Sequence, residues 1–294
     1  MSTKVRKIEV DGEVKVFYRE AGNAANPAIL LLHGYPTTSH MYRNLIPLLA
    51  PHFYVVAPDL PGFGFTDVPD NYVYTFDNLA NTIHSFTKKI NLKKFVIYIF
   101  DYGSPIGFRL ALKDSSSITG IVSQNGNAYL EGIDDRFWGP IKQYWATGNQ
   151  KDPKWSKALI EAIEDPSNII NQYLEGVKDI EQVDPLAYEL DIALFKRPGT
   201  PAVQLELFYD YKKNIEKYPQ FQEYLRTSKV PVLLVWGKND IIFNVAGADA
   251  FKKDVKNLRI SNVDSGHFAL ETHLDEIAQE IIGFVLKLGI DTKL

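Results

Sequence analysis

Short runs of apolar residues, separated by helical patterns, constrain the fold of this chain more than any other feature. The runs occupy residues 28–34, 53–62, 95–100, 118–124, 230–237 and 257–263. Runs of this length without polar alternation are typical of strands that are covered on both faces of a parallel sheet. Helical patterns lie between or after them, over residues 75–90, 105–114 and 274–289. This order predicts an open α/β sheet flanked by helices.

The alternation stops in one long block between the fourth and fifth apolar runs. Residues 126–228 are rich in helix formers and aromatic residues, and the strand pattern resumes at Val230. We therefore expect a helical cap, residues 126–228, inserted into one core domain that is formed by residues 1–125 and 229–294. Near the N-terminus, Asp11-Gly12 lies between two alternating segments and predicts a β-hairpin.

Composition and charge exclude several classes of partner. The formal net charge of −4 does not favour nucleic acid or an anionic membrane. No run of about 18 apolar residues is present, so we expect no membrane span. The chain has no cysteine, and the N-terminus lacks a signal-peptide core, which together fit a cytoplasmic protein. We expect a monomer or a homodimer.

One carboxylate interrupts the apolar run "FVIYIFDYGSPIGFRLAL" where a buried strand should end. Asp101 follows that strand and precedes a helical pattern, with Gly103 two residues later. Ligands of open α/β sheets bind beyond the carboxyl ends of the strands. A side chain on a tight strand-to-helix turn at this edge points into the pocket, so Asp101 is a candidate nucleophile. The alternative is an Asp that merely caps the next helix. A small residue is usual two positions before such a nucleophile, whereas this chain has Ile99.

A carboxylate nucleophile forms an ester, and its turnover requires water activated by a base. His267, in the turn "VDSGHFALETH", is the candidate base. Asp240, in the loop after "VLLVWG", is the candidate acid that orients it, with Asp264 as a weaker rival. The chain order nucleophile, acid, base matches that of α/β-hydrolases.

Ester hydrolysis also places negative charge on an oxygen, which requires hydrogen-bond donors. The backbone N–H groups of Tyr35, in "HGYP", and of Tyr102 are the candidate donors. The Tyr35-Pro36 bond is a candidate cis peptide. His33 in the same motif is expected to have a structural role.

Taken together, "HGYP", "APDLPGFGFTD", "FDYGSPIGFRLAL", "VWGKND" and "SGHFALETH" resemble the α/β-hydrolase superfamily, in its aspartate-nucleophile branch. Within that branch the chain looks most like soluble epoxide hydrolases of the microbial and fungal type. The resemblance implies an α/β-hydrolase fold, with a mostly parallel central sheet and an inserted helical cap. It also implies that Asp101 attacks an epoxide and that water activated by His267 and Asp240 releases a vicinal diol. No metal or organic cofactor is implied; the partners are a small epoxide and water.

The resemblance further implies two cap tyrosines that protonate the epoxide oxygen. Tyr144 and Tyr211 fit these positions, with Tyr209 as a rival or a substrate contact. The aromatic residues Phe137, Trp138 and Trp145 are candidates to line the substrate cavity, although core packing is the simpler interpretation. The family's usual Trp after the nucleophile is replaced by Tyr102.

Other readings of the same residues remain open. A haloalkane or haloacetate dehalogenase would use the same triad; the first requires N–H donors for the halide, and the second an arginine such as Arg109 for the carboxylate. A serine esterase would need Ser104, which lacks a glycine two residues before it and lies past the turn. A catalytically inert binding protein of this fold is the remaining alternative.

Overall fold

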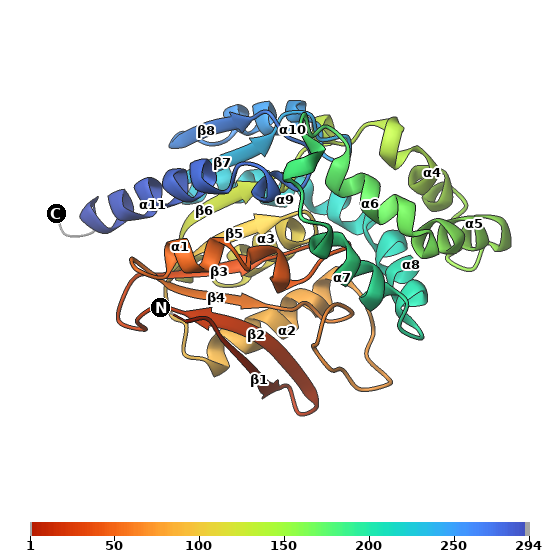
Figure 1. The fold of residues 1–294 in the computed structure, drawn as a ribbon, viewed down its shortest axis with the longest axis horizontal. Coiled ribbons are helices and arrows are strands. Elements are labelled where there is room, and N and C mark those ends of the chain that lie inside the picture. The colour runs from red at the N-terminus through yellow and green to blue at the C-terminus, as the bar shows by residue number, and fades with distance from the viewer. Residues whose placement is uncertain (1, 292–294) are drawn as a thin grey trace.

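A single eight-stranded sheet runs through the centre of the computed structural model, which describes residues 2–291 (Figure 1). The strand order is β1-β2-β4-β3-β5-β6-β7-β8. The first two strands pair antiparallel, β2 also pairs antiparallel with β4, and every later pairing is parallel. The strands are β1 Lys4–Val10, β2 Val14–Ala21, β3 Ala28–Leu32, β4 Tyr54–Pro58, β5 Phe95–Phe100, β6 Ile118–Gln124, β7 Val232–Gly237 and β8 Leu258–Val263. The α/β class and the mostly parallel sheet predicted from the sequence are confirmed.

The apolar runs become strands because both of their faces are covered. Every residue of β3, β5 and β7 is buried, whereas β8 at the sheet edge is largely part-exposed. The predicted hairpin joins β1 to β2, and Asp11 and Gly12 both have positive φ, at 48° and 86°. Asp and Gly tolerate this conformation, which the tight turn requires.

Helices cover the two faces of the sheet. Figure 1 shows α1 (Leu45–Leu49) and α11 (Leu274–Asp291) in front of it, with α2 (Phe76–Lys89) and α3 (Gly103–Lys113) behind. Helix α10 (Val245–Ala250) follows β7. Among the described residues, no helix is both long and apolar enough to cross a membrane.

The segment between β6 and β7, which we call the cap, forms helices at one end of the sheet (Figure 1, right). Its helices are α4 Asp135–Ala146, α5 Pro153–Glu164, α6 Pro166–Leu174, α7 Pro185–Phe195, α8 Thr200–Asp210 and α9 Lys212–Ser228. Three of them begin with an Asp-Pro pair, in which Asp152, Asp165 or Asp184 accepts backbone N–H groups of the first turn. Proline fits the first helical position because its missing N–H has no partner there.

Two buried hydrogen bonds attach the cap to the core. The carboxylate of Asp210 accepts the backbone N–H of Phe76 at 2.8 Å, at the start of α2. The indole N–H of Trp138 donates to the carbonyl of Ile242 at 2.8 Å. Because both partners of such bonds are withdrawn from water, these contacts fix how the cap sits over the sheet edge.

Candidate active site

Asp101 occupies a sharp turn between β5 and α3. Its φ is 47°, in the left-handed region that a non-glycine residue rarely adopts. A Cβ on Gly103 would lie 2.2 Å from the carbonyl oxygen of Leu32, so the turn can pass over β3 only with a glycine there. This conformation costs about 1–2 kcal/mol and directs the carboxylate away from the sheet.

A small residue on the following helix compensates for the large residue before the turn. Ile99 lies in β5, two positions before Asp101, where a small residue is usual in turns of this kind. A Cβ on Gly107 of α3 would lie 2.4 Å from the Cγ2 of Ile99. The helix therefore accommodates the isoleucine, because the small residue stands on the opposite side of the same contact.

The carboxylate of Asp101 is held by backbone N–H groups rather than by its own helix. Oδ1 accepts the N–H of Tyr35 at 2.5 Å, and the N–H of Tyr102 also bonds the carboxylate. Tyr102 is the N-cap of α3, and no side chain caps that helix. A Cβ on Gly34 would lie 2.1 Å from Oδ1, so the His-Gly motif leaves the space that this carboxylate occupies.

The Tyr35-Pro36 bond is cis, as the sequence suggested. In the same motif, Nε2 of His33 accepts the backbone N–H of Leu60 at 2.9 Å, and Nδ1 lies 3.1 Å from the carbonyl of Gly34. His33 therefore ties the loop after β3 to the loop after β4, and it is fully buried.

His267 lies between two carboxylates. Its Nδ1 is 2.7 Å from Oδ2 of Asp240, and its Nε2 is 4.0 Å from Oδ2 of Asp101. The other oxygen of Asp240 accepts the backbone N–H of Ile242 at 2.7 Å. A carboxylate beside Nδ1 fixes the proton on that nitrogen, which leaves Nε2 as the basic atom facing Asp101. Within residues 2–291, Nε2 has no protein hydrogen-bond partner.

Asp264, the rival acid, lies at the surface. It contacts Lys238 at 3.2 Å and Asn239 at 3.0 Å, and about half of its side chain (52%) is exposed. The structure therefore brings Asp240, and not Asp264, to the imidazole.

Asn125 was not singled out from the sequence. It follows β6 directly, has a φ of 48°, and is fully buried. Its amide nitrogen donates to Oδ2 of Asp240 at 2.7 Å, and its Oδ1 accepts the N–H of Gly237 at 2.9 Å. The signal was available, since polar residues after a buried strand mark the ligand-binding edge of a parallel sheet.

Burial and neighbouring charges set the protonation of the pair. Desolvation raises the pKa of Asp101 to about 6, against the lowering effects of His267 and of the two backbone N–H groups. Burial lowers the pKa of His267, but its contacts with Asp240 and the charge of Asp101 outweigh burial, so the net shift is upward. Two coupled groups of this kind titrate as a pair rather than independently.

One cap tyrosine packs on Tyr102, the residue after Asp101, and its hydroxyl contacts that of a second cap tyrosine. Tyr211 is fully buried, and its ring packs on that of Tyr102 at 5.7 Å between centroids. The hydroxyls of Tyr211 and Tyr218 are 3.4 Å apart, and Asn127 donates to the hydroxyl of Tyr218 at 3.3 Å. Burial raises the pKa of both tyrosines, and the charge of Asp101 adds to each shift.

Tyr144 and Tyr209 lie elsewhere in the cap. The hydroxyl of Tyr144 donates to the backbone carbonyl of Gln150 at 2.5 Å, and its ring packs on Tyr209 at 5.0 Å. The ammonium nitrogen of Lys212 lies over the ring of Tyr209, 3.6 Å from its centroid. Tyr211 thus packs on Tyr102 and contacts Tyr218, whereas the hydroxyl of Tyr144 is bonded within the cap.

The predicted substrate-binding aromatics split into two groups. Trp138 and Trp145 pack on Tyr211, at 4.6 Å and 6.3 Å between ring centroids. Their indole N–H groups donate to backbone carbonyls, of Ile242 and Phe208 respectively. Phe137 instead lines a cavity within the cap.

The residues required by two of the competing readings are engaged elsewhere. Arg109 donates to Asp77 at 2.6 Å and to the carbonyl of Pro105 at 3.0 Å, on the side of α3 that faces α2. Ser104 is fully buried and donates to the carbonyl of Asn127 at 3.0 Å. Among the residues that the structure describes, no group of three or more His, Cys, Asp or Glu side chains could hold a metal ion.

Comparison with known proteins agrees with this geometry at the level of the fold. Residues 27–274 match the family model of the alpha/beta hydrolase fold. The chain belongs to the α/β-hydrolase family.

Relatives of this hydrolase have been found in yeast and in bacteria. A protein of Saccharomyces cerevisiae described as an uncharacterized hydrolase is 61% identical over 279 residues, which cover 95% of this chain and 96% of that protein. A haloalkane dehalogenase of Mesorhizobium japonicum is 27% identical over 91% of this chain and 87% of its own. The crystal structure of a haloalkane dehalogenase from Bradyrhizobium elkani superposes with a TM-score of 0.80 at 22% identity, covering 99% of this chain and 100% of that one. A putative lipase from Acinetobacter baumannii gives the same TM-score at 22% identity, covering 98% of this chain and 93% of its own.

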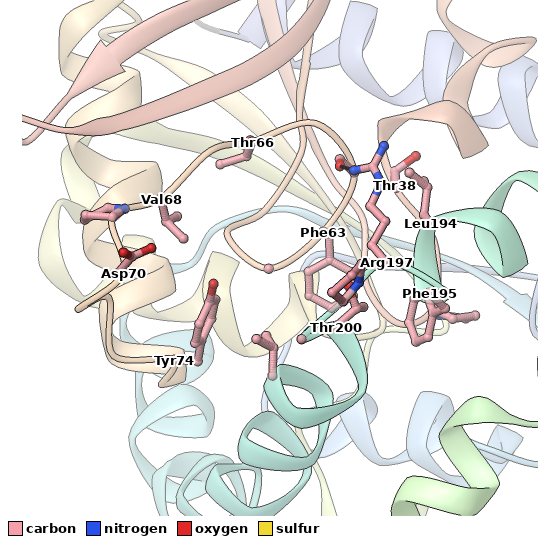
Figure 2. Close-up of a pocket in the computed structure, with 17 residues that line it drawn as sticks. Thr38, Phe63, Thr66, Val68, Asp70, Tyr74, Leu194, Phe195, Arg197 and Thr200 are labelled. Carbon is pink, nitrogen blue, oxygen red and sulfur yellow. Dashed lines mark hydrogen bonds between the residues drawn. The ribbon is translucent and has the colours of Figure 1, made fainter.

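Two cavities of this hydrolase adjoin the aromatic residues around Asp101. The first, of about 360 Å³, lies between the loop after β4 and the corner between α7 and α8, and Figure 2 shows Phe63, Phe195 and Arg197 at its wall. Phe63 packs on Tyr102 at 6.2 Å and Phe195 packs on Tyr35 at 5.3 Å, so these rings separate the cavity from the carboxylate.

The second cavity, of about 430 Å³, lies within the cap and ends on Tyr35 and Ile241. Its lining is predominantly apolar. Both end residues are neighbours of the triad, because Tyr35 holds Asp101 and Ile241 follows Asp240.

Proposed function

We propose that this hydrolase is an epoxide hydrolase that acts through an ester on Asp101. The observation that carries the proposal is the pair of buried phenol groups, Tyr211 and Tyr218, in the field of a carboxylate that faces an imidazole. An epoxide oxygen requires a proton as its ring opens, and a phenol is an acid that can supply one without a metal. No cofactor enters the proposed reaction.

In the first step, Oδ2 of Asp101 attacks an epoxide carbon. The bond from that carbon to the ring oxygen breaks, and the alkoxide takes the proton of a cap tyrosine. Oδ1 stays bonded to the N–H of Tyr35, which leaves Oδ2 as the free oxygen. The buried site favours this attack, because water does not compete for a carboxylate that is only 4% exposed.

In the second step, water hydrolyses the ester. Nε2 of His267 takes a proton from water, and the hydroxide adds to the ester carbon of Asp101. The negative charge develops on Oδ1, which already accepts the N–H of Tyr35, while the N–H of Tyr102 bonds the same carboxylate. When the ester bond breaks, the diol oxygen takes the proton from His267, and the new carboxylic acid returns its proton to the tyrosine. The net reaction is epoxide plus water giving a vicinal diol.

Trapping the ester tests the proposal. In His267→Gln, the first step remains while water activation is lost, so incubation with styrene oxide should add the mass of one epoxide to the intact protein. Asp101→Asn is the control and should gain no mass. An unchanged mass in His267→Gln, together with no diol release by the native enzyme, would exclude the epoxide reaction.

The cap tyrosines are tested by matched removal of single hydroxyls. Tyr211→Phe and Tyr218→Phe should each lower kcat for an epoxide, with a general-acid contribution of about 10²-fold or more for the principal donor. Tyr144→Phe is the comparison, because that hydroxyl is bonded to Gln150. A larger loss in Tyr144→Phe than in the other two would restore the assignment implied by sequence resemblance.

The second candidate is a haloalkane dehalogenase, favoured by the names of several relatives that cover most of this chain. A halide leaving group requires N–H donors. Three of the four tryptophans, Trp138, Trp145 and Trp236, already donate their indole N–H to backbone carbonyls. The fourth, Trp155, lies part-exposed on α5. We therefore rank the epoxide first; halide release from 1-bromobutane without diol release from any epoxide would reverse the order.

A further inference from the structure

The second cavity described above is built from one face of each of three cap helices. Phe137, Pro140 and Ile141 of α4 line it at the spacing i, i+3, i+4. Leu159, Ala162 and Ile163 of α5 line it at the same spacing. Residues with this spacing share one side of a helix, so both helices present an apolar face to the cavity.

The third helix, α6, presents a polar face. Asn168, Asn171 and Gln172 line the cavity at positions i, i+3 and i+4, and Glu175 lines it from the C-cap that follows the helix. Gln172 is only 8% exposed, and its Oε1 has no hydrogen-bond partner among the described side chains and backbone. A buried acceptor of this kind is costly unless something donates to it, and a ligand in the cavity can do so.

The cavity adjoins the proposed reaction centre. Tyr35, at its inner end, donates its N–H to Asp101, and its ring packs on Phe208, a further wall residue, at 5.0 Å. A group bound between α4, α5 and α6 would therefore contact Tyr35, the residue whose N–H holds Asp101.

We propose that this cavity binds the substituent of the epoxide, and that the preferred substrates are uncharged epoxides with an extended apolar chain. The inference rests on the proposed function for the reacting group. The apolar faces of α4 and α5 contact the chain, and Gln172 accepts a hydrogen bond from a hydroxyl or amide on it. Glu175, which also lines the cavity, disfavours a carboxylate because like charges repel.

Chain length is the first test. For the native enzyme, kcat/KM should rise from 1,2-epoxypropane to 1,2-epoxyoctane by up to about fourfold per methylene, the value expected for a buried CH₂. Ala162→Trp fills the cavity from an exposed position of α5. It should lower kcat/KM for epoxyoctane at least tenfold and leave epoxypropane within twofold. Ala158→Trp, one turn earlier and outside the cavity, should keep the native profile.

Binding of 1-octanol tests the cavity without any epoxide chemistry. Calorimetry should detect 1-octanol binding to the native enzyme and to Ala158→Trp, but not to Ala162→Trp, and octanoate should bind more weakly. Gln172→Met, which keeps the side-chain volume, should weaken octanol binding several-fold through loss of one hydrogen bond.

The outcomes separate the two proposals. If no epoxide is hydrolysed, but octanol binds the native enzyme and does not bind Ala162→Trp, the cavity assignment stands and the proposed reaction fails. If epoxides are hydrolysed with no dependence on chain length, or Ala162→Trp affects both epoxides equally, the cavity assignment is wrong and the reaction stands.

Discussion

Replacing Asn125 with Asp tests whether the end of β6 holds the triad acid in place. The substitution keeps the side-chain shape, the oxygen that accepts the N–H of Gly237, and a residue type that tolerates a φ of 48°. It removes the amide that donates to Oδ2 of Asp240 at 2.7 Å and places a second carboxyl there.

The expected cost follows from burial. Both residues are nearly inaccessible, with Asn125 at 0% and Asp240 at 2% exposure. A lost hydrogen bond to a charged group costs about 1.5–3 kcal/mol. Adding an uncompensated charge at a buried site raises the expected loss to about 3–5 kcal/mol at pH 8.

The sign of the pH dependence distinguishes this mechanism from simple loss of packing. The repulsion raises the folded-state pKa of the carboxyl pair above the unfolded-state value of about 3.9. The folded variant then binds more protons than the unfolded chain above pH 4, so its stability relative to the native enzyme falls as pH rises, by up to about 1.4 kcal/mol per pH unit.

Urea denaturation of native enzyme, Asn125→Asp and Asn125→Gly at pH 5 and pH 8 measures these differences. Asn125→Gly permits the same φ and adds no titrating group. Its loss of unfolding free energy relative to the native enzyme should therefore change little between the two pH values. A loss below about 0.5 kcal/mol in Asn125→Asp, equal at both pH values, would refute the contact between Asn125 and Asp240.

Four further predictions follow from the structure. Because burial gives Asp101 a pKa of about 6, kcat/KM for an epoxide should fall as pH drops through 6, while the raised pKa of Tyr211 keeps the alkaline limb above pH 10 in a pH–rate profile. For the same reason, Asp101→Asn should raise the free energy of unfolding at pH 8 by about 1–3 kcal/mol. This gain in the free energy of unfolding should disappear below pH 4, where Asp101 is protonated in both the folded and the unfolded chain. A gain that persists below pH 4 in urea titrations would contradict a raised pKa for Asp101. Gly34→Ala places a Cβ 2.1 Å from Oδ1 of Asp101, so epoxide turnover should fall by about 10²-fold or more, and activity within threefold of native would exclude the tight approach. Asp210→Asn weakens the acceptor of the Phe76 N–H and should lower the free energy of unfolding by about 1–2 kcal/mol in chemical denaturation; an unchanged value would show that this bond does not anchor the cap.

Much of the fold could be predicted because its signals are local. The buried strands are continuous apolar runs, and the β1–β2 hairpin follows from Asp11-Gly12, which can adopt positive φ. The turn at Asp101 follows from the order of strand, carboxylate and glycine. In each case the deciding interactions join residues that are close in sequence, so the pattern and the structure carry the same information.

The positions of the side chains in the cap could not be predicted from local signals. Tyr144 and Tyr218 are both buried aromatic residues of cap helices, and the sequence does not distinguish them. Their hydroxyls are separated by tertiary contacts, since one donates to Gln150 and the other lies beside Tyr211.

The sequence by itself determined which segments form the buried strands and where the turn at Asp101 lies. It also determined that a histidine and an acidic residue follow later strands. Only the tertiary structure decided that Asn125 supports Asp240, that Arg109 is paired with Asp77, and which phenols lie near the carboxylate. The physical reason is that backbone preferences act between neighbours along the chain. The direction of a cap side chain depends instead on how helices dock, and that docking is set by a few buried hydrogen bonds between residues far apart in sequence.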